Sequence, residues 1–189
     1  ASDVYKRQDS DVPLAVLIGL KNLLIGGFTR ERFVEWLSLP IVSEKFDLES
    51  DDLAILNRWL AAAGFEVGLN PAHLDAQRDA QAADPRQTQV YAPAALHELT
   101  FERALERLAF GWMLPQDEDA APYGDVLPVV GTELGGWDAT GEKSGLLLKL
   151  ANLYAVLETL RLKTAEGEKL TDGTSAHFWT LWIGEVLQK

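Results

Sequence analysis

One stretch of the chain, GGWDATGEKSG at residues 135–145, contains the residue types of a phosphate-binding loop. Two glycines separated by four residues are followed by a lysine and a serine, and an apolar helix pattern begins directly afterwards. A nucleotide-binding P-loop needs a strand, a glycine-rich turn, a Lys-Ser pair and a helix in that order, because backbone N–H groups and the ammonium must converge on the same phosphates. If this loop were functional, the chain would be a nucleotide hydrolase.

Two features argue against nucleotide binding at this loop. Glu142 is inserted between Gly141 and Lys143, which displaces the lysine by one residue and puts a carboxylate where phosphate oxygens would lie. The preceding run DVLPVV has Pro128 at its centre, and proline disfavours a central strand. No apolar strand ending in aspartate follows to hold magnesium. We interpret the stretch as a glycine-rich connection in which Ser144 is the N-cap of the next helix.

The three histidines do not form a metal-binding pattern. His73, His97 and His177 are far apart in the sequence, whereas a zinc motif on a helix needs two histidines four residues apart. We expect each to be a lone surface or cap residue. The chain contains no G-x-S-x-G nucleophile elbow, and its paired acids occur where a helix begins or in a loop. The sequence therefore predicts no catalytic residue, no metal ligand and no cofactor.

An aromatic cluster near the end of the chain, formed by Phe178, Trp179 and Trp182, could in principle stack nucleic-acid bases. Such a site also needs a cationic groove, but this segment carries Glu185 and only the terminal Lys189. We therefore expect the cluster to pack in a core or an interface, including against residues that continue beyond this chain.

Composition limits the class of protein. The 189 residues suit one domain of ordinary size, and the absence of cysteine excludes disulfides, thiolate metal sites and cysteine nucleophiles. The net charge is −12, and residues 108–142 contain seven acids without a lysine or arginine. Such a surface repels polyanions, because nucleic-acid binding depends on neutralising phosphates. With no apolar run near the length of a membrane span and no secretory signal, we expect a soluble, cytoplasmic protein.

Both ends of the chain resemble cuts. The only methionine is Met113, and the final WTLWIGEVLQK is helical in pattern but has no cap or breaker. The opening residues 1–8 follow no structural period, and DVYKRQ resembles a translated sequencing adaptor, so we exclude residues 1–8 from the fold. We expect an internal piece of a longer protein.

Helix signals dominate the rest of the chain. The helices are predicted from apolar spacing, capping residues and glycine or proline stops. The first predicted helix is apolar nearly all round and should be buried, and a short turn is expected at residues 41–46. The helix predicted at residues 144–163 is the most apolar, and most of its circumference should be covered. The predicted helices are residues 12–25, one capped by Thr29 and ended by Leu39-Pro40, 51–63 with Ser50 as cap, an exposed helix from Asn70, 101–112 with Thr100 as cap, 144–163, and Ala176 to the end. The predicted class is all-α, an irregular helical bundle.

Three segments resemble the RecC family, the gamma subunit of exodeoxyribonuclease V in the RecBCD helicase–nuclease. The first, at residues 28–70, has a helix ending near Leu-Pro, a phenylalanine before a capped helix with tryptophan, and a glycine-marked turn. The second, LTFERALERLAFGWML at residues 99–114, is similar to a family helix pattern. The third, at residues 123–160, resembles the family's Leu-Pro, acidic glycine-containing loop and apolar helix.

The resemblance implies a domain arrangement and a role. Residues 9–27 would form the edge of a helicase-core-like domain, and residues 28–189 a helical domain similar to the 2B insertion of superfamily 1 helicases, truncated at its C-terminus. The family implies a non-catalytic, helicase-like subunit with a structural and DNA-guiding role in double-strand break repair and homologous recombination. Its partners would be RecB-like and RecD-like subunits, with DNA contacted mainly by other domains and no membrane.

Two other interpretations remain open from the sequence. The chain could be a free-standing acidic helical module for protein interaction, which would fold cooperatively and stay monomeric. A related helicase-like subunit of the AddB type would share the fold and differ mainly in its neighbours.

Overall fold

The protein folds as a helical bundle. The computed structural model describes residues 14–25, 27–82, 93–113, 122, 124–129 and 142–166. A helix at residues 14–24, which we call the first helix, precedes the labelled helices. These are α2 (Arg30–Leu37), α3 (Pro40–Lys45), α4 (Ser50–Ala62), α5 (Pro71–Ala82), α6 (Pro93–His97), α7 (Phe101–Met113) and α8 (Glu142–Glu166). Within these residues no strand occurs, which confirms the all-α class.

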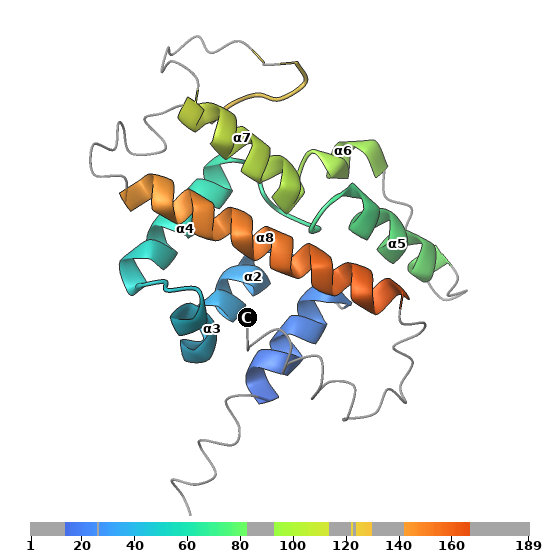
Figure 1. The fold of residues 1–189 in the computed structure, drawn as a ribbon. Helices are drawn as coiled ribbons and strands as arrows, with labels where there is room; N and C mark the ends of the chain where they lie inside the picture. Colours follow the sequence, from blue (N-terminus) through green and yellow to red (C-terminus); the bar gives the residue numbers. More distant parts are fainter. Residues whose placement is uncertain are drawn as a thin grey trace, which may run out of the picture.

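The longest helix, α8, organises the bundle. In Figure 1 it runs across the front of the fold, with α7 along one side and α4, α2 and the first helix behind it. Its inward face is a row of leucines at helical spacing, and each of them is buried. The row comprises Leu146, Leu150, Leu153, Leu157 and Leu160.

Phenylalanines fill the centre of the core. Phe28, Phe33, Phe65 and Phe101 are fully buried, and their ring centroids lie between 4.8 and 6.2 Å apart in tilted and edge-on arrangements. Aromatic pairs prefer these offset geometries because the edge of one ring meets the face of another. The four rings come from three separate stretches of sequence, so they hold together segments that the chain leaves far apart.

The backbone around these rings is joined by hydrogen bonds outside the helices. The extended segment at residues 65–70 lies between residues 28–30 and residues 99–102. Gly68 N–H donates to the Phe28 carbonyl at 2.6 Å, and the Gly68 carbonyl accepts from Phe101 N–H at 3.0 Å. Thr29 and Val67 form an isolated antiparallel bridge. These bonds satisfy backbone groups that would otherwise be buried without partners.

Two of the predicted caps are confirmed. The Thr29 hydroxyl oxygen accepts from the Arg32 N–H at the start of α2. Thr100 does the same for Arg103 N–H at the start of α7, and its hydroxyl donates to the His97 carbonyl at 2.9 Å.

Two other caps were predicted wrongly. Ser50 is the first residue of α4 and Glu49 is its cap, because Glu49 and Asp52 form a reciprocal capping box. The helix α8 begins at Glu142, so Ser144 lies inside its first turn and is not the N-cap.

Three predictions about structure and burial also need correction. Residues 41–46 are not a turn: most of them form α3, since Pro40 has a backbone φ suited to the first helical position. The first helix is not buried all round, because Leu14, Ile18 and Ile25 are exposed. The outer face of α8 is likewise open, with Leu148 exposed by 62% of its surface. In the first helix and in α8 the pattern identified the apolar residues, but only the packing decides which of them are buried.

Candidate functional site

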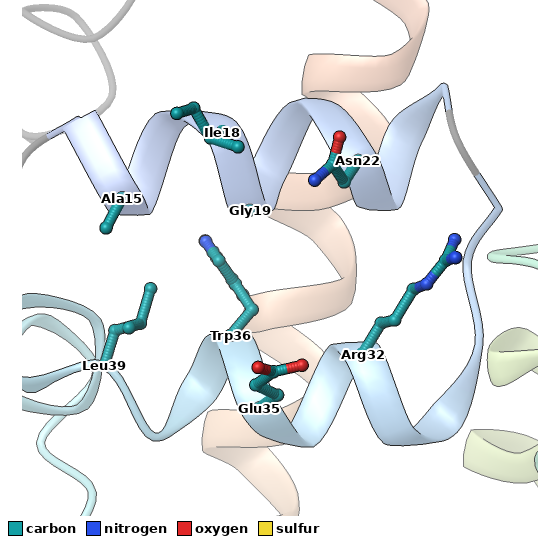
Figure 2. A pocket seen from close by; sticks show the side chains of 8 residues that line it. All are labelled: Ala15, Ile18, Gly19, Asn22, Arg32, Glu35, Trp36 and Leu39. Atoms are coloured by element: carbon teal, nitrogen blue, oxygen red, sulfur yellow. The ribbon is translucent and has the colours of Figure 1, made fainter.

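An open groove lies between the first helix and α2 and has a volume of about 610 Å³. Figure 2 shows the two helices on either side of it, with α8 passing behind both. Apolar and small side chains form most of the lining, with three polar residues among them. The lining residues are Ala15, Ile18, Gly19 and Asn22 from the first helix and Arg32, Glu35, Trp36 and Leu39 from α2 and its C-terminal end.

The floor of the groove depends on Trp36 and Gly19. The Trp36 indole points from α2 toward the first helix (Figure 2), and its Nε1–H donates to the Val16 carbonyl at 3.1 Å. A Cβ at position 19 would lie 2.7 Å from Trp36 Cδ1, so only glycine lets the indole approach this closely. The hydrogen bond satisfies the one polar atom of a ring that is otherwise packed against apolar groups.

The rim of the groove combines polar and apolar groups. Arg32 donates to the Gly27 carbonyl at 3.1 Å, which ties the end of the first helix to α2. Ile18 lies at the other rim. Together with Leu14 and Ile25 it forms an exposed apolar stripe, and the exposed fractions are 53% for Leu14, 50% for Ile18 and 47% for Ile25. An apolar floor with few polar groups suits the binding of an apolar segment better than acid–base chemistry.

A buried polar network connects the first helix to α5. His73 is only 3% exposed, and its Nδ1 accepts from Leu69 N–H at 3.2 Å while Nε2 lies 2.9 Å from the Leu24 carbonyl. Because Nδ1 accepts, the proton of the neutral ring must be on Nε2, which donates to Leu24. Burial lowers the pKa of His73 below its ordinary value, against the opposing effect of the Leu24 bond. The prediction of a surface or cap position is wrong for His73.

The same network continues to α7 and α8 through Asn70 and Tyr154. Asn70 accepts from His73 N–H at 2.9 Å and donates to the Tyr154 hydroxyl at 3.3 Å. That hydroxyl donates to the Glu102 carboxylate at 2.6 Å. Burial, followed by the bond to Glu102, raises the pKa of Tyr154 well above its ordinary value. The tyrosine is therefore a hydrogen-bond donor and not an acid.

Glu158 and Arg161 complete this region on α8. Arg161 Nε and Nη2 donate to the two oxygens of Glu158 at 2.7 and 2.6 Å, a bidentate pair one helical turn apart. Burial alone would raise the pKa of Glu158, but the bonds and charge of Arg161 outweigh it and the pKa lies below its ordinary value. The pair places opposite charges beside the neutral His73 without leaving either uncompensated.

Arginines of α7 form a second polar cluster. Arg103 bonds to Glu98, Glu106 and Asp125 at 2.8–3.0 Å, and these bonds raise the pKa of its guanidinium. Arg107 donates to Glu98 at 2.9 Å and to the Ala63 carbonyl at 3.0 Å. Ala63 is the C-cap of α4, so Arg107 places a positive charge at the negative end of that helix. These cations stabilise the fold.

The other residues considered from the sequence are those of the P-loop-like stretch, two histidines and the aromatic cluster. Lys143, Ser144 and Gly145 lie in the first turn of α8, whereas Gly135, Gly136 and Gly141 lie outside the described residues. His97 is half-buried and bonds Asp75 at 3.3 Å. His177 and the aromatic cluster at residues 178–182 also lie outside the described residues. Sequence reasoning missed Trp36, Asn70 and Tyr154, for which no motif exists.

Across the described residues, no group of three or more histidine or acidic side chains is arranged to hold a metal ion. No helix in the same part of the chain has both the length and the apolar composition needed to cross a membrane.

The comparison with protein families identifies the family of this chain. The family model described as the fourth domain of the RecC subunit of the RecBCD enzyme matches residues 11–188. The chain belongs to the RecC family. A comparison with curated proteins gave no match. The match includes the first helix, all the labelled helices and the aromatic cluster near the end, so the groove and the polar network lie within the matched residues.

Proposed function

We propose that this chain is a non-catalytic, helicase-like part of a RecC-type subunit, with a structural and DNA-guiding role in double-strand break repair and recombination. The observation that carries the proposal is the family match over residues 11–188. In this proposal the parent subunit assembles with RecB-like and RecD-like subunits in the cytoplasm, and other domains make most of the contacts with DNA.

The polar contacts of the fold support a structural role. Arg103, Arg107 and Arg161 are bound to carboxylates or backbone carbonyls of the domain itself. Cations that bind phosphate must be available to replace counterions, and these three are already used in packing α7, α4 and α8. Together with a net charge of −12, this arrangement favours a scaffold over a DNA-binding surface.

The proposal includes a domain arrangement. Residues 9–27 would be the edge of a helicase-core-like domain, and residues 28–189 a domain similar to the 2B insertion, with residues 1–8 foreign to both. The first helix would then join two units, since it also packs on α2 through Trp36 and Val16.

A chimeric subunit tests the function. Residues 9–189 would replace the fourth domain of a RecC subunit that is co-expressed with its RecB and RecD partners. We expect a stable three-subunit complex with ATP-dependent exonuclease activity, measured by gel filtration and release of acid-soluble nucleotides. Lys143→Ala should leave the ATPase rate unchanged, because the chain contributes no nucleotide site. A soluble chimera that fails to bind either partner would contradict the proposal.

The isolated chain tests the assignment of DNA contacts to other domains. We expect no change in the fluorescence anisotropy of labelled single-stranded DNA at roughly micromolar concentrations and low salt, because an acidic surface releases no counterions from DNA. Salt-dependent binding in this range would show instead that the domain itself grips the strand.

A further inference from the structure

The contacts around Asn70 form a continuous path from α8 to the end of the first helix. Tyr154 on α8 bonds the Asn70 side chain, Asn70 bonds the backbone of His73, and the His73 ring bonds the Leu24 carbonyl. Asn70 and His73 are only 5 and 3% exposed, so water does not replace these bonds. Contiguous networks of this kind can carry energetic coupling between separate elements.

We propose that Tyr154, Asn70 and His73 act as a polar relay that couples the position of α8 to the end of the first helix. In this relay Tyr154 is a positioning residue: its hydroxyl orients Asn70, Asn70 holds the first turn of α5, and His73 holds Leu24. A displacement of α8 that breaks the bond between Tyr154 and Asn70 would weaken the bond at Leu24. The coupling belongs to the described residues themselves and does not depend on the proposed function.

The donor and acceptor roles along the relay follow from its first member. An ionised carboxylate only accepts, so the Tyr154 hydroxyl donates to Glu102 at 2.6 Å and accepts from Asn70 at 3.3 Å. The amide nitrogen of Asn70 therefore faces Tyr154, and the amide oxygen faces the His73 N–H. Because one role fixes the next, removal of the hydroxyl weakens the constraint on the orientation of the Asn70 amide.

The position of α8 sets the start of the relay. Besides bonding Tyr154, the Asn70 amide interacts with the Glu158 carboxylate, which lies one turn further along α8. Glu158 is itself held by Arg161, which donates to its two oxygens at 2.7 and 2.6 Å. Both side chains that hold the amide nitrogen therefore move with the same helix.

Asn70 passes the constraint on because it caps α5. It directly precedes Pro71, the first residue of α5, and its side-chain oxygen accepts from the N–H of His73, the third residue, at 2.9 Å. A side chain in this position satisfies an N–H group that the helix itself leaves without a partner. The orientation of the Asn70 amide therefore decides where the first turn of α5 is held.

His73 carries the constraint to the first helix. Its Nδ1 accepts from Leu69 N–H at 3.2 Å, which leaves the proton on Nε2 to bond the Leu24 carbonyl at 2.9 Å. Leu24 lies in the last turn of the first helix, where carbonyl groups have no partner within the helix. The ring also packs edge-on against Phe28, with ring centroids 6.1 Å apart. A shift of α5 therefore removes the partner of the Leu24 carbonyl.

Nuclear magnetic resonance of the full chain tests the relay at its far end. Tyr154→Phe removes only the hydroxyl, which bonds Asn70 and Glu102 and not His73. We expect the Nε2 proton of His73 and the amide protons of residues 21–25 to exchange with solvent several-fold faster than in the unmodified chain. The nitrogen chemical shifts of the ring should also show that the single Nε2–H tautomer of the unmodified chain is lost.

Two other variants separate the relay from general destabilisation. Gly111→Ala disturbs the fold outside the relay, because its Cβ would lie 2.2 Å from the Val129 carbonyl oxygen. It should speed exchange at His73 no more than in the amides of α4. Asn70→Ala removes the cap together with the relay and should speed exchange at His73 at least as much as Tyr154→Phe does.

Three results would overturn the proposal. The first is unchanged exchange of the His73 ring proton in Tyr154→Phe. The second is the same pattern of acceleration in Tyr154→Phe and Gly111→Ala, which would reduce the effect to a loss of overall stability. The third is an effect of Asn70→Ala without any effect of Tyr154→Phe, because the cap of α5 would then act without α8.

Discussion

At the scale of single residues, His73 shows how an uncharged histidine joins separate parts of the fold. Its ring accepts from Leu69 and donates to Leu24, so both nitrogens are used by the neutral form. Protonation would turn Nδ1 into a second donor facing an N–H group, and the charge would be buried. The residue therefore acts as a fixed connection between the first helix and α5.

We predict that acid weakens the fold through His73. Its pKa is lower in the folded than in the unfolded chain, so the unfolded chain binds more protons below about pH 6.5. The stabilisation by the neutral ring is complete above that pH and is lost as the pH falls toward the folded pKa. One proton contributes at most about 1.4 kcal/mol per pH unit.

Urea unfolding at pH 7.5 and 5.5 measures this effect. The decrease in unfolding free energy should be smaller in His73→Gln than in the unmodified chain, whereas His97→Gln should keep the full decrease. An identical pH dependence in the His73→Gln variant would show that the ring accepts a proton without cost.

Tyr154 provides a second prediction at this scale. Tyr154→Phe removes the donor to Glu102 and the acceptor for Asn70 and leaves both in a half-buried region. Hydrogen bonds to charged groups contribute about 1.5–3 kcal/mol, so we expect a loss of unfolding free energy in the lower part of this range. Thr159→Ala is the control, since that hydroxyl bonds only within its own helix. Equal effects of both changes would contradict the role of the network.

At the scale of elements, the contact between a helix and a connecting segment can require a residue that helix propensity disfavours. Gly111 lies inside α7 and Gly145 inside α8, so helix propensity alone would favour alanine at both positions. A Cβ at position 111 would lie 2.2 Å from the Val129 carbonyl oxygen, whereas a Cβ at position 145 meets nothing within 4 Å. The connection at residues 124–129 can therefore pack this closely against α7 only because residue 111 has no side chain.

Alanine at these two glycines should have opposite effects. We expect Gly111→Ala to destabilise the fold by about 1–3 kcal/mol, because backbone must move to accommodate the methyl group. Gly145→Ala should be neutral or stabilising by up to about 1 kcal/mol, because it restricts the unfolded chain in a helix that has room. Thermal and urea unfolding of both variants would measure the difference, and two stabilised variants would disprove the close contact at Val129.

At the scale of the whole molecule, the first helix shares one core with the helices that follow it. Leu20 and Leu23 are 5 and 1% exposed and belong to the same cluster as Trp59 and Leu108. The indole of Trp36 adds a hydrogen bond between the first helix and α2. A helix held by these contacts should not open independently of its neighbours.

Native-state hydrogen exchange in low urea tests this cooperativity. We expect protected amides of residues 14–24 to exchange with the same free energy and the same urea dependence as those of α4 and α7. A lower free energy confined to the first helix would show that these contacts do not hold it to the rest of the fold.

Much of the fold was predictable from residue patterns. The helical class, the caps at Thr29 and Thr100, and the family resemblance carried by residues 28–70 and 99–114 all rest on short-range signals. Helix formation and capping involve residues three or four apart, so they are written in the sequence itself. The burial of Phe33, Leu56 and Leu108 follows from the same spacing.

The candidate site was not predictable in this way. Trp36 meets Gly19, and His73 meets the Leu24 carbonyl, across separations that no motif records. The sequence shows that the first helix is apolar on nearly every side, but the stripe at Leu14, Ile18 and Ile25 stays about half exposed.

The sequence by itself determined the helical class and, through its patterns, the family of this protein. Only the tertiary structure decided which apolar surface is core and which is groove, and which polar groups are neutral and buried. The physical reason is that burial and hydrogen bonding depend on the side chains that long-range packing brings together, whereas helical periodicity depends on near neighbours alone.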